Sequence, residues 1–151
     1  QQPRHGWALH EVLSPSGEIG TAWTLSKQLV YRAIDSLVDA GLVRRAAPKD
    51  GGGGDRVVIS PTAAGRRVAQ QWLQTPVQHL RDVRTELVVK VMLRQECGLP
   101  LAPFIQEQRK QFEPLIAAIE SVPATTPVHM WRHESATAVK RYLTRLEKSA
   151  K

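Results

Sequence analysis

The chain has 151 residues, with 21 Lys and Arg against 14 Asp and Glu, a formal net charge of +7 and a sequence pI near 10.1. An apolar fraction of 42% predicts a packed core and argues against disorder, while no apolar run approaches the roughly 20 residues of a membrane span. The start of the chain has no signal-peptide pattern, and a single cysteine, Cys97, excludes an intramolecular disulfide. We therefore expect a reducing, cytoplasmic setting, and the basic balance makes a polyanion the first partner to consider.

Two helices are predicted in the first forty-one residues. Apolar positions three and four residues apart predict one helix over His5–Leu13 and a second over Leu25–Gly41. Thr24 or Ser26 can cap the start of the second helix, and Gly41 suits its end. The apolar positions of this helix that we expect to face the core are Leu29, Ala33, Ile34 and Leu37.

A hairpin and a third helix follow. Two β-prone runs, Leu42–Ala46 and Arg56–Ser60, flank a glycine-rich stretch and predict two strands joined by a long loop. The order helix, helix, hairpin is typical of a winged helix-turn-helix, and we expect the first helix of that fold to be missing here. The third helix is expected over residues 62–74. This reading assigns a winged helix-turn-helix domain to residues 1–74.

Residues 75–151 are predicted to form a C-terminal helical domain, so the fold class is mainly α with a small β-hairpin. Near the centre of this domain, apolar residues recur in alternating steps of four and three residues, and Gln108 occupies the one polar position of this pattern. The spacing indicates a coiled-coil-like seam. The members of this seam are Ile105, Phe112, Leu115, Ile119 and Val122. Pro114 is expected to kink or break that helix. Residues 123–127 read as a linker to a last helix.

The second helix and the hairpin carry residues that suit DNA binding. Polar side chains in the first half of such a helix can reach base edges or phosphates in the major groove, and cations beside a glycine-rich tip can neutralise phosphates. Between residues 44 and 67, six basic residues accompany only two acidic ones. The candidate DNA-binding residues are Ser26, Lys27, Gln28, Tyr31 and Arg32 on the helix and Arg44, Arg45, Lys49 and Arg56 on the hairpin. An amphipathic helix with a merely solvated polar face is the alternative.

Other functions find less support in the sequence. His129 and His133 have a spacing that can place two imidazoles on one metal ion, but no third ligand has a telling spacing. The chain carries no catalytic motif, and acids such as Asp35 read as solvated charge, so we expect neither enzymatic activity nor a cofactor. Tryptophans could line an apolar effector cavity, and the candidates are Trp7, Trp72 and Trp131.

Several fragments resemble the PadR family of transcriptional regulators. They are His5-Gly6-Trp7, Val30-Tyr31-Arg32, Gly41-Leu42-Val43, Ile59-Ser60-Pro61-Thr62 and, for the longer-tailed subgroup, Trp131-Arg132-His133-Glu134. The resemblance implies a homodimeric cytoplasmic repressor that binds a near-palindromic operator in double-stranded DNA. It also implies C-terminal helices that form the dimer and an effector that releases the DNA, which we expect to be small and apolar or aromatic. Trp7 departs from the family, which usually has Tyr there, and the family's first apolar helix is expected to be missing here.

The sequence therefore predicts a sequence-specific DNA-binding regulator, with the DNA-binding domain over residues 1–74 and the dimerisation domain over residues 75–151. Two alternatives stay open. One is a metal-responsive regulator that uses His129 and His133. The other is a winged-helix module that binds a protein instead of DNA.

Overall fold

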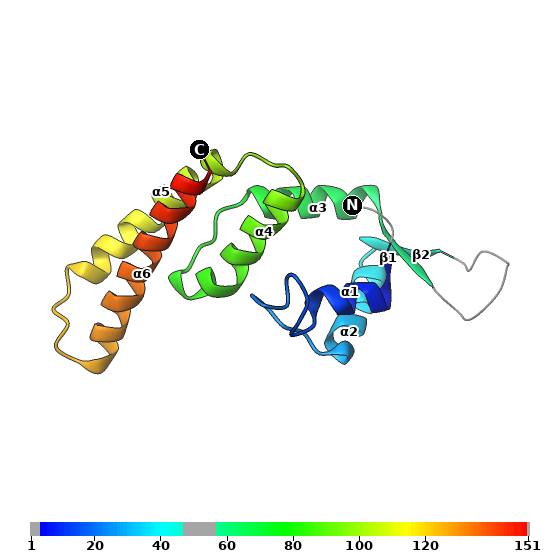
Figure 1. The fold of residues 1–151 in the computed structure, drawn as a ribbon, viewed down its shortest axis with the longest axis horizontal. Helices are drawn as coiled ribbons and strands as arrows, with labels where there is room; N and C mark the ends of the chain where they lie inside the picture. The colour runs from blue at the N-terminus through cyan, green and yellow to red at the C-terminus, as the bar shows by residue number, and fades with distance from the viewer. Residues whose placement is uncertain (1–3, 47–56, 151) are drawn as a thin grey trace. The chain divides into compact units, whose positions relative to one another are not determined.

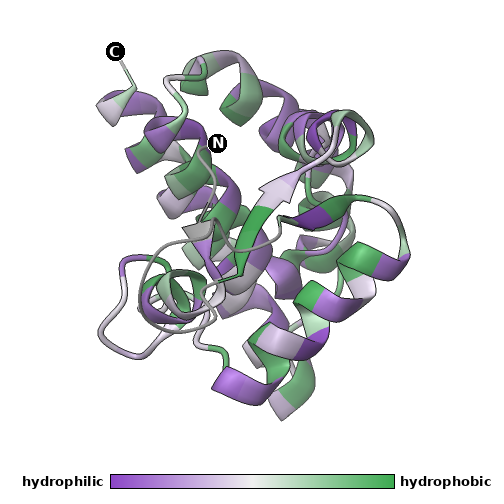
Figure 2. Cartoon of the chain, turned by 90° about the vertical axis from the view of Figure 1, so that its right-hand side faces the viewer, coloured by the Kyte–Doolittle hydropathy of each residue, from purple (hydrophilic) through white to green (hydrophobic). Residues whose placement is uncertain are grey.

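The structure, a computed structural model, describes residues 4–46 and 57–150. The chain divides into two compact units, Gln1–Trp72 and Leu73–Lys151, and each is considered by itself. In Figure 2, apolar and polar residues alternate along the helical ribbons, as expected for amphipathic helices. Within the described residues, no helix is both long and apolar enough to span a bilayer.

The first unit contains two helices, three short strands and most of a third helix. In chain order these elements are β1 (Arg4–His5), α1 (Gly6–Leu13), α2 (Lys27–Asp39), β2 (Val43–Ala46), β3 (Val58–Pro61) and α3 (Ala63–Gln74). The predicted helices and hairpin are confirmed, and their order defines a winged helix with a small β-sheet. The glycine-rich stretch predicted between the strands lies outside the described residues.

The sheet has one strand more than predicted. Its order is β1-β3-β2, and both pairings are antiparallel. The added strand is β1, in which Arg4 and His5 pair with Ile59 and Val58 of β3. Two residues are too few to show the alternation that identifies a strand from sequence, so only the long-range pairing reveals it.

The buried side of α2 differs from the predicted one. Val30 and Ile34 are buried in the first unit, where α1 packs against α2. Leu29 is 47% exposed, and Ala33 and Leu37 are exposed as well, so the prediction that these three face the core is wrong. Both stripes have helical spacing, and adjacent residues differ by only about 100° around a helix, so the choice between them depends on where α1 and the sheet lie.

The second unit is helical throughout. After α3 it contains the single turns η1 (Leu80–Asp82) and η2 (Val83–Leu87), followed by α4 (Val88–Glu96), α5 (Leu101–Glu120) and α6 (Pro127–Ser149). The two long helices lie side by side, as Figure 1 shows, and pack against one another. Thr126 caps α6 by accepting a hydrogen bond from the His129 amide at 3.2 Å.

The hydrophobic core cluster of the described residues lies within this second unit. Its members are Val77, Val83, Leu87, Val91, Phe104, Ile105, Phe112, Ile116, Ala136, Val139 and Leu143. The seam on α5 passes through Ile116, whereas Leu115 is exposed, so the strict alternation predicted for this helix is wrong after Phe112. The helix also continues through Pro114 without ending. That residue is exposed, so water can satisfy the carbonyl that loses its amide partner.

Candidate nucleic-acid interface

Both ends of α2 are fixed by local hydrogen bonds. At the start, the Ser26 side chain accepts from the Leu29 amide at 3.4 Å, which identifies Ser26 as the cap. At the end, Gly41 has φ 67°, and the Leu42 amide donates to the Leu37 carbonyl at 2.9 Å, a Schellman motif. The helix therefore begins and ends at defined residues, so its exposed side chains have a fixed register.

Tyr31 on α2 packs against the start of α1. A Cβ atom placed on Gly6 would lie 3.2 Å from Cε1 of the Tyr31 ring and 3.4 Å from its hydroxyl oxygen. Gly6 is buried, while Tyr31 stays partly exposed. The ring thus joins two fragments of the predicted motif set, His5-Gly6 and Val30-Tyr31-Arg32, in one contact. Tyr31 therefore makes a structural contact and is also a candidate DNA-binding residue.

The exposed face of α2 presents a polar and basic set of side chains. Lys27, Gln28 and Arg32 are all exposed, and none of the three has a carboxylate partner among the described residues. Lys27 and Gln28 lie in the first turn, where main-chain N–H groups and the helix dipole favour an anion. This surface can therefore offer cations and an amide to a polyanion without first breaking an ion pair.

An ion pair joins α2 to strand β2. The Arg45 guanidinium donates a hydrogen bond to the Asp35 carboxylate, and both side chains are substantially exposed. The sequence alone predicts a solvated charge at Asp35 and a phosphate contact at Arg45. The structure instead pairs them, which no local spacing could have indicated because ten residues separate the two. Arg44, the neighbour of Arg45 on the strand, is exposed and points to the other face of the sheet.

The start of α3 is anchored to the turn between α2 and β2. The Thr62 hydroxyl donates to the Gly41 carbonyl at 2.8 Å and accepts from the Gly65 amide at 3.0 Å. A Cβ atom on Gly65 would lie 1.9 Å from the Leu42 carbonyl oxygen, so only glycine fits at this close approach. Nearby, Arg66 donates to the Pro61 carbonyl at 2.9 Å. These residues of the predicted post-hairpin motif hold the hairpin base in place.

Two candidates of the predicted set, Lys49 and Arg56, lie outside the described residues. The remaining seven are Ser26, Lys27, Gln28, Tyr31, Arg32, Arg44 and Arg45, and they occupy α2, its cap and strand β2 of one unit. Their chemistry suits the recognition of a phosphate backbone and of base edges, because arginine and glutamine can form paired hydrogen bonds to bases.

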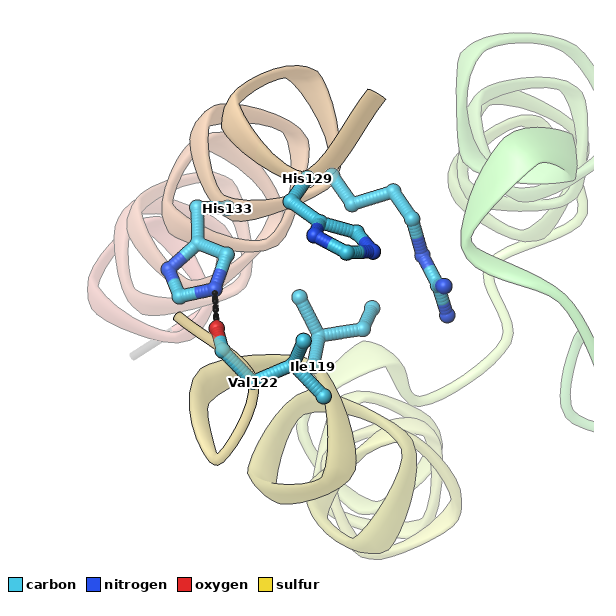
Figure 3. Close-up of a pocket in the computed structure, with 5 residues that line it drawn as sticks. Ile119, Val122, His129 and His133 are labelled. Atoms are coloured by element: carbon cyan, nitrogen blue, oxygen red, sulfur yellow. Dashed lines mark hydrogen bonds between the residues drawn. The ribbon is translucent and has the colours of Figure 1, made fainter. Parts of the chain in front are cut away.

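A second candidate site lies between the end of α5 and the start of α6. A small open hollow there is lined by Ile119, Val122, His129, Arg132 and His133, most of which are labelled in Figure 3. His133 Nε2 lies 2.7 Å from the Val122 carbonyl oxygen, and His129 Nδ1 is buried without a hydrogen-bond partner in the described structure. The described residues include no group of three or more His, Cys, Asp or Glu side chains arranged to hold a metal ion.

The tryptophans predicted to bind an effector are not among the residues that line this hollow. Trp7, Trp72 and Trp131 are all exposed, and Trp131 is 73% exposed on α6.

Comparison with known proteins identifies no close relative. No protein-family model and no curated protein sequence matches this chain. Among solved structures, the crystal structure of Bacillus subtilis PadR in complex with operator DNA is similar, with 15% sequence identity and a TM-score of 0.48. The similarity covers 99% of this chain and 89% of that one.

Proposed function

We propose that this protein is a sequence-specific DNA-binding transcriptional regulator that acts as a homodimer on a palindromic operator. In this proposal α2 is the recognition helix and the β2–β3 hairpin is the wing. Gln28 and Arg32 read base edges, while Lys27, Tyr31 and Arg44 contact phosphates. A cytoplasmic repressor released by a small apolar or aromatic effector is the form of regulation that the sequence resemblance implies.

The observation that carries the proposal is the exposed face of α2. This helix is capped at both ends, carries cations without acidic partners, and is joined to a basic strand through Asp35 and Arg45. An ordinary surface helix needs polarity but has no need of a fixed register relative to a neighbouring strand. A reading helix needs both, because base contacts fail when the side chains shift by an ångström or two.

The homodimer is supported by apolar surface at the start of α6. Val128, Met130 and Trp131 are exposed there, beside the exposed Val122 at the end of α5. Large apolar side chains that are exposed together on a surface can mark an interaction site. The helical unit offers such a surface while its own core is already packed, so we assign dimerisation to residues 75–151.

The metal-responsive alternative is disfavoured by the arrangement of its two histidines. His133 already contacts the Val122 carbonyl through Nε2, and the described residues supply no third ligand near the pair. No observation in the described structure favours the protein-interaction alternative, which selection of DNA fragments can reveal. Unchanged thermal stability on addition of Zn²⁺ would remove the metal alternative.

The decisive experiment is selection of bound sequences from genomic DNA fragments with the purified full chain. We expect enrichment of one near-palindromic sequence and an affinity that falls steeply with salt concentration. Recovery of fragments with no common sequence would contradict sequence-specific recognition and favour the protein-interaction alternative.

Three variants then test which residues of the proposed DNA-binding surface read bases and which contact phosphates, the third being a control. Gln28→Ala should change the preferred base at one position per half-site and cost about 1–3 kcal/mol of binding free energy. Arg44→Ala should weaken binding to all sequences and reduce the salt slope by about one. Arg141→Ala removes the same charge from an exposed position of α6 and is the matched control, for which we expect the parent slope.

A further inference from the structure

Three polar side chains are buried in the helical unit, and all three bind the main chain of one segment. Lys90 is 1% exposed, Arg94 is 7% exposed and Gln108 is fully buried. The segment they bind is Leu73–Val77, which begins in the last turn of α3 and is the first part of the helical unit. We call these three side chains the main-chain clamp.

The clamp satisfies four main-chain groups within five residues. The Lys90 ammonium donates to the Thr75 carbonyl at 2.7 Å, and the Arg94 guanidinium donates to the Leu73 carbonyl at 2.9 Å. These carbonyls lie at the C-terminal end of α3, where they lack helical partners and carry the negative end of the helix dipole. Two cations from α4 therefore meet the end of α3.

Gln108 fixes the register of the segment. Its amide oxygen accepts from the Val77 amide at 2.7 Å, and its amide nitrogen donates to the Val77 carbonyl at 2.9 Å. The side chain thus forms the paired bonds that a neighbouring strand would form. The preceding residue, Pro76, has no N–H, so a shift of the segment by one residue in that direction would leave Gln108 without a donor.

Stability alone does not explain why this core contains charge. Moving an ammonium or a guanidinium into a core carries a large desolvation cost, and apolar residues of similar volume often fill such positions with equal or greater stability. Glu86 pairs with Lys90 at 2.8 Å, and the Arg94 guanidinium lies 4.5 Å from the centre of the Phe104 ring. Even so, Arg94 Nε is buried without a partner. Arg94 also donates to the Pro100 carbonyl, so what the three side chains share is that each of them binds the main chain of Leu73–Val77.

We propose that Lys90, Arg94 and Gln108 are positioning residues that set the half-site spacing accepted by the homodimer. This inference depends on the proposed function. The chain passes from the first unit to the second within α3, between Trp72 and Leu73, and the clamped segment begins directly after this boundary. If the helical units form the dimer, each reading helix is joined covalently to its own half of the dimer through one copy of this segment. Holding it in one conformation keeps the second half-site within reach and excludes operators with a different spacing.

The test compares Gln108→Leu with Gln111→Leu in the full chain. Gln108→Leu removes the paired bonds to Val77 with little change of volume. Gln111 lies one turn further along α5, and its amide donates to the Gln78 side chain at 3.1 Å, so Gln111→Leu is the matched control. Affinities are measured for the selected palindrome, for a single half-site, and for palindromes whose spacer is longer or shorter by one or two base pairs.

We expect Gln108→Leu to weaken binding to the palindrome by about tenfold, to leave half-site affinity within about twofold, and to flatten the dependence on spacer length. Gln111→Leu should behave as the parent. Equal losses on palindrome and half-site, or an unchanged spacer profile, would overturn the inference while leaving DNA binding intact. A parent protein that selects no DNA sequence would overturn both proposals.

Lys90→Met combined with Glu86→Gln provides a second variant in case Gln108→Leu does not fold. It removes the buried ion pair without leaving a single charge behind, a change that often preserves stability. Circular dichroism and gel filtration verify helix content and dimerisation before DNA is added. The same loss of spacer selectivity is expected, and a parent-like spacer profile in this folded variant would overturn the role of Lys90.

Discussion

The two units differ in what they bury. In the first unit, Val30 and Ile34 are the large apolar side chains that the described residues bury, while Trp7, Trp23 and other large apolar residues stay exposed. The second unit contains the whole hydrophobic core cluster and, in addition, three buried polar side chains. The first unit therefore exposes large apolar side chains, whereas the second packs its apolar side chains into a core.

The proposed function assigns DNA reading to the first unit and dimerisation to the second, and this difference suits those two roles. A reading surface needs exposed cations and amides in a fixed register, and the first unit achieves that register through caps, close glycine contacts and one ion pair. A dimerisation unit needs stability of its own, which the second obtains from packed aliphatic and aromatic side chains. We therefore expect the first unit to be the less stable of the two. Parts of one chain can unfold locally with different free energies, so the first unit can unfold while the second stays folded.

The largest expected effect tests the core of the second unit. Phe112 is fully buried on α5, so Phe112→Ala should lower the free energy of unfolding by about 3–5 kcal/mol in urea denaturation. Leu115→Ala on the same helix is the control, and because Leu115 is exposed we expect a loss below about 1 kcal/mol. Similar losses from both variants would restore the seam predicted from sequence and contradict the packing described here.

The next effect tests the close contacts of the first unit. Gly65→Ala places a methyl group against the Leu42 carbonyl, and we expect it to cost about 1–3 kcal/mol even though alanine favours helix. Thermal unfolding followed by circular dichroism measures the loss. Arg67→Ala, an exposed position on the same helix, should change stability little. A stabilised Gly65→Ala variant would show that α3 is not anchored to the turn after α2.

A smaller effect tests the ion pair that joins α2 to β2. Asp35→Asn frees Arg45 for DNA phosphates, so we expect tighter binding to unrelated sequences and a salt slope steeper by about one. The change in stability should stay within about 1 kcal/mol, since the pair is exposed. Asp39→Asn removes the same charge one turn later without freeing Arg45. Equal salt slopes for the two variants would contradict a role for the pair.

The smallest effect concerns the partly buried Tyr142 of the second unit. Burial raises the pKa of its hydroxyl, so the folded state favours the protonated form. The unfolded chain releases this proton first as the pH rises past about 10, and stability therefore falls above that pH. Urea denaturation from pH 8 to 11 should show a shallower decline for Tyr142→Phe. Identical declines would mean that Tyr142 does not titrate with unfolding.

Much of the local structure could be predicted from sequence. The helices over residues 6–13, 27–39 and 63–74, the hairpin after Gly41 and the ends of α2 all follow from apolar spacing and turn chemistry. The candidate DNA-binding residues follow from residue type and position alone, and they stay a prediction. Errors arose where two helical stripes were equally apolar, as in α2, and where a seam changed its step, as after Phe112 on α5.

The sequence by itself determined the helices and the hairpin of the first unit and their order, the polar side chains of α2 and the basic character of the hairpin, because each depends on residues a few positions apart. Only the tertiary structure decided which stripe of α2 is buried, that Asp35 holds Arg45, and that Gln108 binds Val77 across a separation of 31 residues. Such contacts form between elements, and the spacing of residues within one element carries no information about which neighbour it will meet.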